Sequence, residues 1–259
     1  MEKAPVILLL HAITRSAADY NTFVASIDGE FDTIAPNLLG HGRQNRSARY
    51  QLADYRDALL RQIPAAGDLV LWGHSLGGLV ALALVDHLES RVTGIVLEDV
   101  PLFEVDWPRF RDGPFYEGFR YLHERLSQGV QDAADLINEV AGWPSGKGEK
   151  TFAEHFGMDG VKQRATELMS LDPRTLEPPM TGQITGDLDV RTMLSKAQCP
   201  VYLLAGHRDI GSALTEDDLV EYRRVCPAGA VQQFGNLGHD IRMFEQRACA
   251  KVLRTLATR

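Results

Sequence analysis

Cysteine is scarce in this sequence, with three residues in a chain of 259. Cys199, Cys226 and Cys249 are widely spaced, and their odd number does not suit a disulfide framework. The sequence also lacks C-x-x-C and H-E-x-x-H spacings, so it predicts neither a metal centre nor a cofactor. We therefore expect reduced thiols in a cytoplasmic protein.

Positive charge and long apolar runs are scarce as well. Lys and Arg number 27 against 35 Asp and Glu, which gives a formal net charge of −8. This balance argues against a nucleic acid or an anionic membrane as partner. The first apolar run, residues 6–10, ends at His11 and is too short for a signal peptide or a membrane span. We expect a globular protein that acts on a small molecule, and the sequence leaves its oligomeric state open.

Apolar stretches of strand length alternate with segments of helical periodicity along most of the chain. The expected strands are residues 5–10, 31–35, 68–72, 92–97, 200–205 and 230–234. Helices are expected at 18–27, 52–63, 79–88 and 216–225, and again near the C-terminus. Strands that alternate with helices predict an α/β fold, in which a mostly parallel sheet is covered on both faces.

The stretch Gly73-His-Ser-Leu-Gly77 lies between an expected strand and an expected helix. A G-x-S-x-G motif in this context is a nucleophile elbow, a strained turn that exposes a serine hydroxyl above the sheet. The glycines on either side permit the strand and the helix to approach closely. The sequence therefore predicts Ser75 as the nucleophile of an acyl-transfer enzyme.

Acyl transfer also needs a base for the serine and an acid that orients this base. His239 lies in a glycine-containing loop between the last expected strand and the last helix, from which its imidazole can reach Ser75. Asp209 follows the penultimate strand and Asp99 ends the strand after the elbow. Both give the order Ser, Asp, His along the chain. We favour Asp209 as the acid and keep Asp99 as the alternative.

The alternation of strands and helices is interrupted between residues 102 and 186, where only helical stretches and loops are expected. Half of the aromatic residues lie in this segment. The sequence predicts a core of residues 1–101 and 187–259 with a helical lid, residues 102–186, above Ser75. The aromatic side chains either form a small core of the lid itself or line an apolar substrate pocket.

Four stretches together resemble the α/β-hydrolase family, and within it the lidded serine esterases. They are the elbow, Asn37-Leu-Leu-Gly-His-Gly42, the loop with Asp209, and Gly238-His-Asp-Ile241. The resemblance covers nearly the whole chain and implies the α/β-hydrolase fold, with about six strands because no strand pair precedes Val6. It also implies an oxyanion hole made by the backbone N–H groups of Ile13 and Leu76. The family's His-Gly pair before the oxyanion loop is His11-Ala12 here.

The nucleophile narrows the chemistry that this resemblance implies. Relatives that open epoxides or displace halide carry aspartate at the elbow, so Ser75 argues against both reactions. We expect a cofactor-free hydrolase that cleaves a carboxylic ester of a small apolar substrate through an acyl-enzyme, with lactones, thioesters or activated C–C bonds as variants. Two alternatives remain. One is a lyase that resembles the menaquinone-pathway synthase and uses the same triad for proton abstraction. The other is a binding protein with slow hydrolase activity.

Overall fold

The computed structural model describes residues 4–27, 29–103, 105, 108–130, 132–147 and 149–257. In these residues a single sheet of six parallel strands has the order β2-β1-β3-β4-β5-β6. The strands are β1 (Val6–Leu10), β2 (Thr33–Ile34), β3 (Leu69–His74), β4 (Val92–Glu98), β5 (Val201–Ala205) and β6 (Ala230–Gln233). The predicted α/β fold is thus confirmed.

Alternate side chains of the strands pack against two separate layers of helices. Leu8, Leu71 and Leu97 belong to one apolar cluster, whereas Leu9, Trp72 and Val96 belong to the other. Successive residues of a strand point to opposite faces, and both faces are buried here. This explains why the inner strands β1, β3, β4 and β5 are mostly apolar and why the sequence predicted them well.

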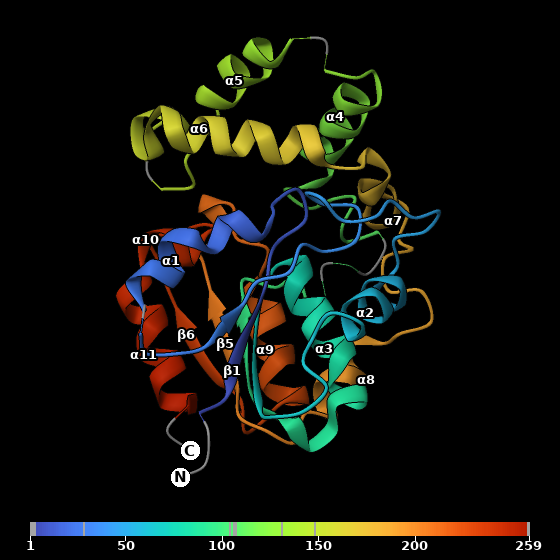
Figure 1. Ribbon diagram of the computed structural model, residues 1–259, viewed down its shortest axis with the longest axis vertical. Coiled ribbons are helices and arrows are strands. Elements are labelled where there is room, and N and C mark those ends of the chain that lie inside the picture. Colours follow the sequence, from blue (N-terminus) through green and yellow to red (C-terminus); the bar gives the residue numbers. More distant parts are fainter. Residues whose placement is uncertain are drawn as a thin grey trace.

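The two helical layers lie on either side of the sheet (Figure 1). The first layer contains α2 (Leu52–Leu60), α3 (Leu76–Leu88), α8 (Val190–Ser195) and α9 (Glu216–Val225). The second contains η1 (Ala17–Tyr20), α1 (Asn21–Ser26), α10 (Ile241–Phe244) and α11 (Gln246–Ala257). The sequence predicted one continuous helix over residues 18–27, but the chain forms a 3₁₀ turn before α1.

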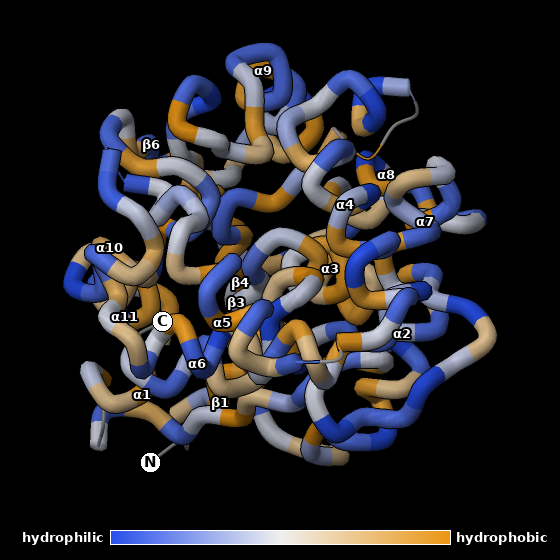
Figure 2. Tube along the Cα trace, turned by 90° about the horizontal axis from the view of Figure 1, so that it is seen from above, coloured by the Kyte–Doolittle hydropathy of each residue, from blue (hydrophilic) through white to orange (hydrophobic). Residues whose placement is uncertain are grey.

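The segment between β4 and β5 forms helices, short turns and one isolated bridge in its described part. Its longer helices, α4 to α6, lie together beyond one end of the sheet in Figure 1, and in Figure 2 α5 and α6 are in front of β3 and β4. Besides α8, its helices and turns are α4 (Tyr116–Ser127), α5 (Ala133–Ala141), α6 (Phe152–Ser170), η3 (Pro173–Leu176) and α7 (Glu177–Met180). Short 3₁₀ turns elsewhere are η2 (Glu89–Arg91) and η4 (Arg208–Ile210).

Membrane insertion was not expected from the sequence. Within the described ranges, none of the helices combines the length and the apolar character that a bilayer span requires.

Candidate active site

Ser75 is the single residue between β3 and α3, and its backbone is strained. It has φ 52° and ψ −118°, a region that side-chain-bearing residues rarely adopt. The turn is tight because neighbouring backbones pack closely against it. A Cβ on Gly73 would lie 2.4 Å from the carbonyl carbon of Gly77, and one on Gly77 would lie 2.0 Å from the carbonyl oxygen of Leu10. The glycines of the motif are therefore required by packing.

His239 lies after β6 and is hydrogen-bonded to a buried carboxylate. Its Nδ1 lies 2.7 Å from Oδ2 of Asp99. The Asp99 side chain is fully buried and accepts three further hydrogen bonds, from Gly206 N at 3.0 Å, Ser212 Oγ at 2.6 Å and Ala213 N at 2.7 Å. This arrangement fixes the proton of His239 on Nδ1 and leaves Nε2 free to accept a proton.

Asp209, the acid favoured from the sequence, does not contact His239. Its side chain is 89% exposed, and the ring nitrogen 3.9 Å from it belongs to His207. The loop after β5 passes around the carboxylate of Asp99, to which both Gly206 and Ala213 donate. Asp209 lies at the outer turn of this loop and faces solvent. The preference for Asp209 was therefore wrong on geometry, and the alternative, Asp99, takes the position beside the histidine.

Two rings pack against the imidazole of His239. The ring of His74 is 4.6 Å away between centroids, and its Nε2 lies 3.0 Å from the carbonyl oxygen of His239. The ring of Phe115, from the segment before α4, is 4.8 Å away. Burial lowers the pKa of His239, but the hydrogen bond and the charge of Asp99 raise it, together with the charges of Asp240 and Glu98. The net pKa lies above its usual value.

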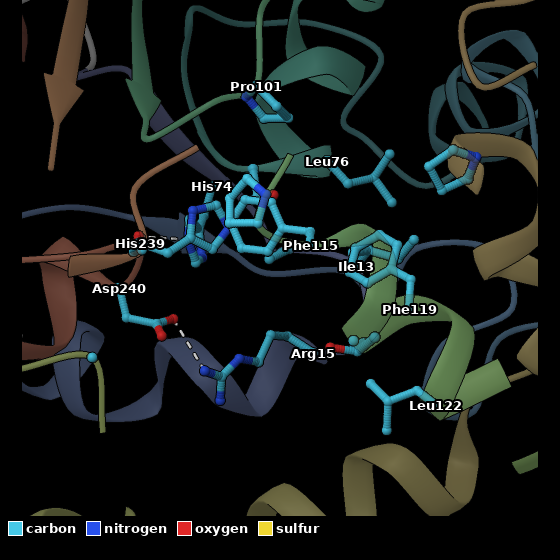
Figure 3. Close-up of a pocket in the computed structure, with 18 of the residues that line it drawn as sticks. Ile13, Arg15, His74, Leu76, Pro101, Phe115, Phe119, Leu122, His239 and Asp240 are labelled. Carbon is cyan, nitrogen blue, oxygen red and sulfur yellow. Dashed lines mark hydrogen bonds and ion pairs between the residues drawn. The ribbon is translucent and has the colours of Figure 1, made fainter. Parts of the chain in front are cut away.

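Ser75 and His239 both line a cavity of about 560 Å³ between the carboxyl ends of the strands and the helices above them. Most of the lining is apolar and comes from both sides, as Figure 3 shows for Leu76, Phe119 and Leu122. Further apolar side chains in the lining are Ile13, Leu79, Pro101, Val105, Phe110, Trp143, Pro179, Ile184 and Ile210. The described residues contain no cluster of three or more His, Cys, Asp or Glu placed to hold a metal ion.

A family model described as "Alpha/beta hydrolase family" matches residues 7–255. This chain belongs to the alpha/beta hydrolase family. The resemblance and the fold class predicted from the sequence are thereby confirmed.

This hydrolase is similar to curated proteins over different shares of its length. An uncharacterized protein of Mycobacterium tuberculosis is 36% identical over 107 residues, which are 37% of this chain and 31% of that protein. "Lipase LipV" of M. tuberculosis is 32% identical over 108 residues, 41% of each chain. The match thus spans less than half the length of these relatives. A pimeloyl-[acyl-carrier protein] methyl ester esterase of Aromatoleum aromaticum is 24% identical over 256 residues, 96% of each chain.

Solved structures share the fold of this hydrolase. A putative aryl esterase from Burkholderia cenocepacia has a TM-score of 0.75 at 18% identity and covers 99% of this chain and 92% of its own. The N-formylmaleamic acid deformylase of Pseudomonas putida has a TM-score of 0.74 at 18% identity, with 97% and 92% covered. At these identities the likeness concerns the fold alone.

The two residues predicted to form the oxyanion hole line the cavity together with Ser75. They are Ile13, in the loop after β1, and Leu76, the first residue of α3. Among the described residues neither N–H group has a hydrogen-bond acceptor. The close packing of Gly77 on Leu10 brings this loop to the start of the helix. In this loop the residue with a positive φ is Thr14, at 67°, and not Ala12, which stands where the family has glycine.

A buried charged group that sequence reasoning missed lies at one side of the cavity. Arg15 donates to Oδ1 of Asp240 at 3.0 Å (Figure 3) and lies 3.7 Å from Asp19. Arg164 of α6 also lines the cavity and is 6% exposed. Nothing in the local sequence around these four residues marks them as a buried cluster. Asp240 follows the predicted histidine, but its partner is 225 residues away.

Proposed function

We propose that this protein is a serine hydrolase that cleaves carboxylic esters of small apolar substrates through an acyl-enzyme. The observation that carries the proposal is the 2.7 Å contact between Asp99 and His239 at a cavity that also contains the strained Ser75. The names of the esterase relatives agree with it. Serine, histidine and a buried aspartate in these roles are the machinery of acyl transfer.

The proposed reaction has two halves. Ser75 Oγ attacks the acyl carbon while His239 Nε2 takes the hydroxyl proton, and the bond to the alcohol breaks as His239 returns that proton to the leaving oxygen. Water then attacks the acyl-enzyme with His239 as base, which releases the acid and restores Ser75. The negative charge that develops on the carbonyl oxygen would be stabilised by the N–H groups of Ile13 and Leu76.

The lining of the cavity supports an apolar substrate. Its side chains are mostly aliphatic and aromatic, and they come from the segment 102–186 as well as from the sheet side. In this proposal residues 102–186 act as a lid on the core of residues 1–101 and 187–259, and exclude water from the acyl-enzyme. Lactones and thioesters present the same acyl carbon to Ser75 and are included in the proposal.

The lyase alternative needs cations that face a multiply anionic substrate. Arg111 and Arg120, in the segment 102–186, are exposed and pair with Asp112 and Glu117. Arg15 and Arg164 line the cavity, but both are already hydrogen-bonded to the protein. The charges therefore favour an uncharged acyl group over a polyanion.

Three free cysteines agree with the reducing cytoplasm expected from the sequence, and we propose that location.

The proposal is tested by trapping the acyl-enzyme. Wild-type protein is mixed with p-nitrophenyl butanoate and its intact mass is measured, in parallel with labelling by a fluorophosphonate. We expect one acyl group and one phosphonyl group on wild type, and neither on Ser75→Ala. Ser195→Ala, an exposed serine of α8, is the matched control and should be labelled like wild type. Ester turnover without acylation of Ser75 would overturn the acyl-enzyme, and no reaction at all would favour the lyase or the binding protein.

A further inference from the structure

Thr14 occupies a backbone conformation that its side chain disfavours. It directly follows Ile13 and has φ 67°, in the left-handed region that β-branched residues avoid. Such a conformation persists only where the surroundings hold it in place. Rotation about this φ moves the peptide between Ile13 and Thr14, which adjoins the peptide that carries the Ile13 N–H group. Whatever holds Thr14 therefore restrains the loop immediately next to that amide.

The group that holds Thr14 comes from α6, in the segment above the cavity. One terminal nitrogen of Arg164 donates a hydrogen bond to the carbonyl oxygen of Thr14. The other terminal nitrogen donates to Thr14 Oγ1 at 2.6 Å. The Thr14 N–H group donates to Nε2 of His41 at 3.3 Å. Burial lowers the pKa of His41 to about 3, so its Nε2 is an acceptor at neutral pH. All polar groups of Thr14 are thus engaged.

A second contact joins the same helix to the same loop. Ser16 Oγ donates to Oε1 of Glu167 at 2.9 Å, and Glu167 lies 3.5 Å from Arg164. Arg164 and Glu167 are buried, 6% and 4% exposed, and are one helical turn apart. The helix therefore holds residues 14–16 at two points, immediately beyond the Ile13 amide.

We propose that Arg164 is a positioning residue for the oxyanion hole, and that the lid acts through it on the Ile13 amide as well as covering the cavity. This inference rests on the proposed acyl-transfer function. A planar guanidinium suits the task because its two nitrogens bind two oxygens of one residue in a fixed geometry. Burial and the nearby charge of Arg15 lower the pKa of Arg164 to about 10, which leaves it charged at neutral pH.

Two other roles for Arg164 make different predictions. It could recognise an anionic substrate with its remaining N–H groups, since each terminal nitrogen donates one hydrogen bond to Thr14; loss of Arg164 would then weaken the binding of anionic substrates, and not of an uncharged ester. It could also serve only to pack the lid, since its guanidinium lies 5.8 Å from the Trp143 ring. A packing role would change how substrates bind, whereas a role in the oxyanion hole changes the rate once they are bound.

The test compares Arg164→Met with Lys162→Met, which removes a cation from an exposed position of the same helix. Three quantities are measured with butanoyl compounds: kcat and KM for the p-nitrophenyl ester, Ki for a trifluoromethyl ketone, and Ki for the corresponding alcohol. Ser75 adds to the carbonyl carbon of the ketone, which forms an oxyanion. The alcohol fills the cavity but cannot form an oxyanion.

We expect Arg164→Met to lower kcat about 100-fold, as loss of an oxyanion donor does, and to raise the Ki of the ketone by a similar factor. KM and the Ki of the alcohol should change by less than about threefold, because ground-state binding is untouched. Arg164→Lys, which cannot donate along two parallel directions, should recover only part of kcat. Lys162→Met should match wild type.

A second pair of variants keeps the inference testable where Arg164→Met fails to fold. Thr14→Val keeps the shape of the side chain and removes only Oγ1, whereas Thr14→Ser keeps the hydroxyl. We expect Thr14→Val to lose more of kcat and of ketone affinity than Thr14→Ser.

The inference is overturned if a folded Arg164→Met variant keeps the kcat of wild type. It is also overturned if the Ki of the alcohol rises as much as the Ki of the ketone. It is also overturned if the two Thr14 variants behave alike. The fluorophosphonate assay tests the proposed function separately. If Ser75 of the wild type is not labelled, the proposed function is wrong, whatever the Arg164 variants do.

Discussion

Asp99 and His239 share a 2.7 Å hydrogen bond across 140 residues of sequence. The bond joins the end of β4 to the loop after β6. These two strands lie on either side of β5 in the sheet. Asp99 reaches the histidine from an unusual backbone position, with φ 44°. The Asp99 N–H group donates to the carbonyl oxygen of Leu204 in β5 at 2.8 Å. This bond anchors Asp99 at the carboxyl end of the sheet.

Replacing the two candidate acids should therefore have very different effects. Asp99→Asn keeps the shape but removes the charge behind His239, and we expect kcat for an ester to fall about 10³- to 10⁴-fold. Asp209→Asn changes an exposed carboxylate and should alter kcat by less than about threefold. Steady-state kinetics of both variants check this, and a larger loss from Asp209→Asn contradicts the assignment.

Folding must be separated from catalysis in that comparison, because Asp99 also accepts bonds from the loop after β5. Ser212→Ala removes one of these donors and leaves the contact with the histidine in place. We expect Ser212→Ala to destabilise the fold by about 1 kcal/mol, measured by urea unfolding, and to keep most of kcat.

The pH dependence of kcat/KM should report the environment of His239. The imidazole must be neutral to take the Ser75 proton, so activity is lost as pH falls through its pKa. Burial lowers this pKa, but the nearby carboxylates, Asp99 foremost, raise it above its usual value. We expect the acid limb of wild type to have its midpoint above about 6.5, and that of Asp99→Asn to lie at lower pH. An acid limb that does not move would exclude Asp99 as the partner.

The apolar lining predicts a dependence on acyl chain length. Each buried methylene should contribute about 0.8 kcal/mol, close to fourfold in kcat/KM, from acetate upward until the cavity is full. Leu122→Asn places a polar group in the lining and should flatten this series. Val220→Asn, at a position 65% exposed on α9, is the matched control. A wild-type series that is flat or falling from acetate to hexanoate would refute an apolar pocket.

The ion pair between Arg15 and Asp240 should matter for stability. Burial raises the pKa of Asp240, but the charge of Arg15 leads the effects that lower it, and the net pKa is well below its usual range. Such a carboxylate contributes stability above its unfolded pKa of about 3.9 and loses it as pH falls through the folded pKa. Arg15→Met leaves a buried charge unpaired and should cost about 3–5 kcal/mol at pH 7.

This cost should shrink near pH 4, where Asp240 takes up a proton in the variant. Urea unfolding at both pH values measures the difference. The double variant Arg15→Met/Asp240→Asn should regain part of the loss at pH 7, because it removes the unpaired charge. A cost that is equal at both pH values would mean that packing, not charge, stabilises the pair.

The elements that the sequence predicted well have local causes. The strands β1, β3, β4 and β5 are apolar on both faces, and the elbow is defined by glycines whose neighbours lie within a few residues or one strand away. β2 was expected over 31–35 but forms only at Thr33–Ile34, since the edge of the sheet offers one partner strand instead of two. The division into core and lid stays a prediction.

The acid could not be chosen from the sequence because two neighbouring strands each end with an aspartate nearby. The choice depends on which way the loop after β5 faces, and that is decided by its hydrogen bonds to Asp99. The contacts of Arg15 with Asp240 and of Arg164 with Thr14 span 225 and 150 residues. No local pattern marks such pairs, since each residue alone resembles an ordinary charged side chain.

Asp99 accepts four hydrogen bonds, and a carboxylate has about four lone-pair positions. The three bonds other than that from His239 all stabilise the ionised carboxylate, so Asp99 acts as a fixed charge and does not take the proton of His239. A single proton then travels in each half of the cycle, between the imidazole and the reacting oxygen. In mixtures of light and heavy water, the rate of the chemical step should decrease in a straight line with the deuterium fraction, whereas two protons moving together would give a curve.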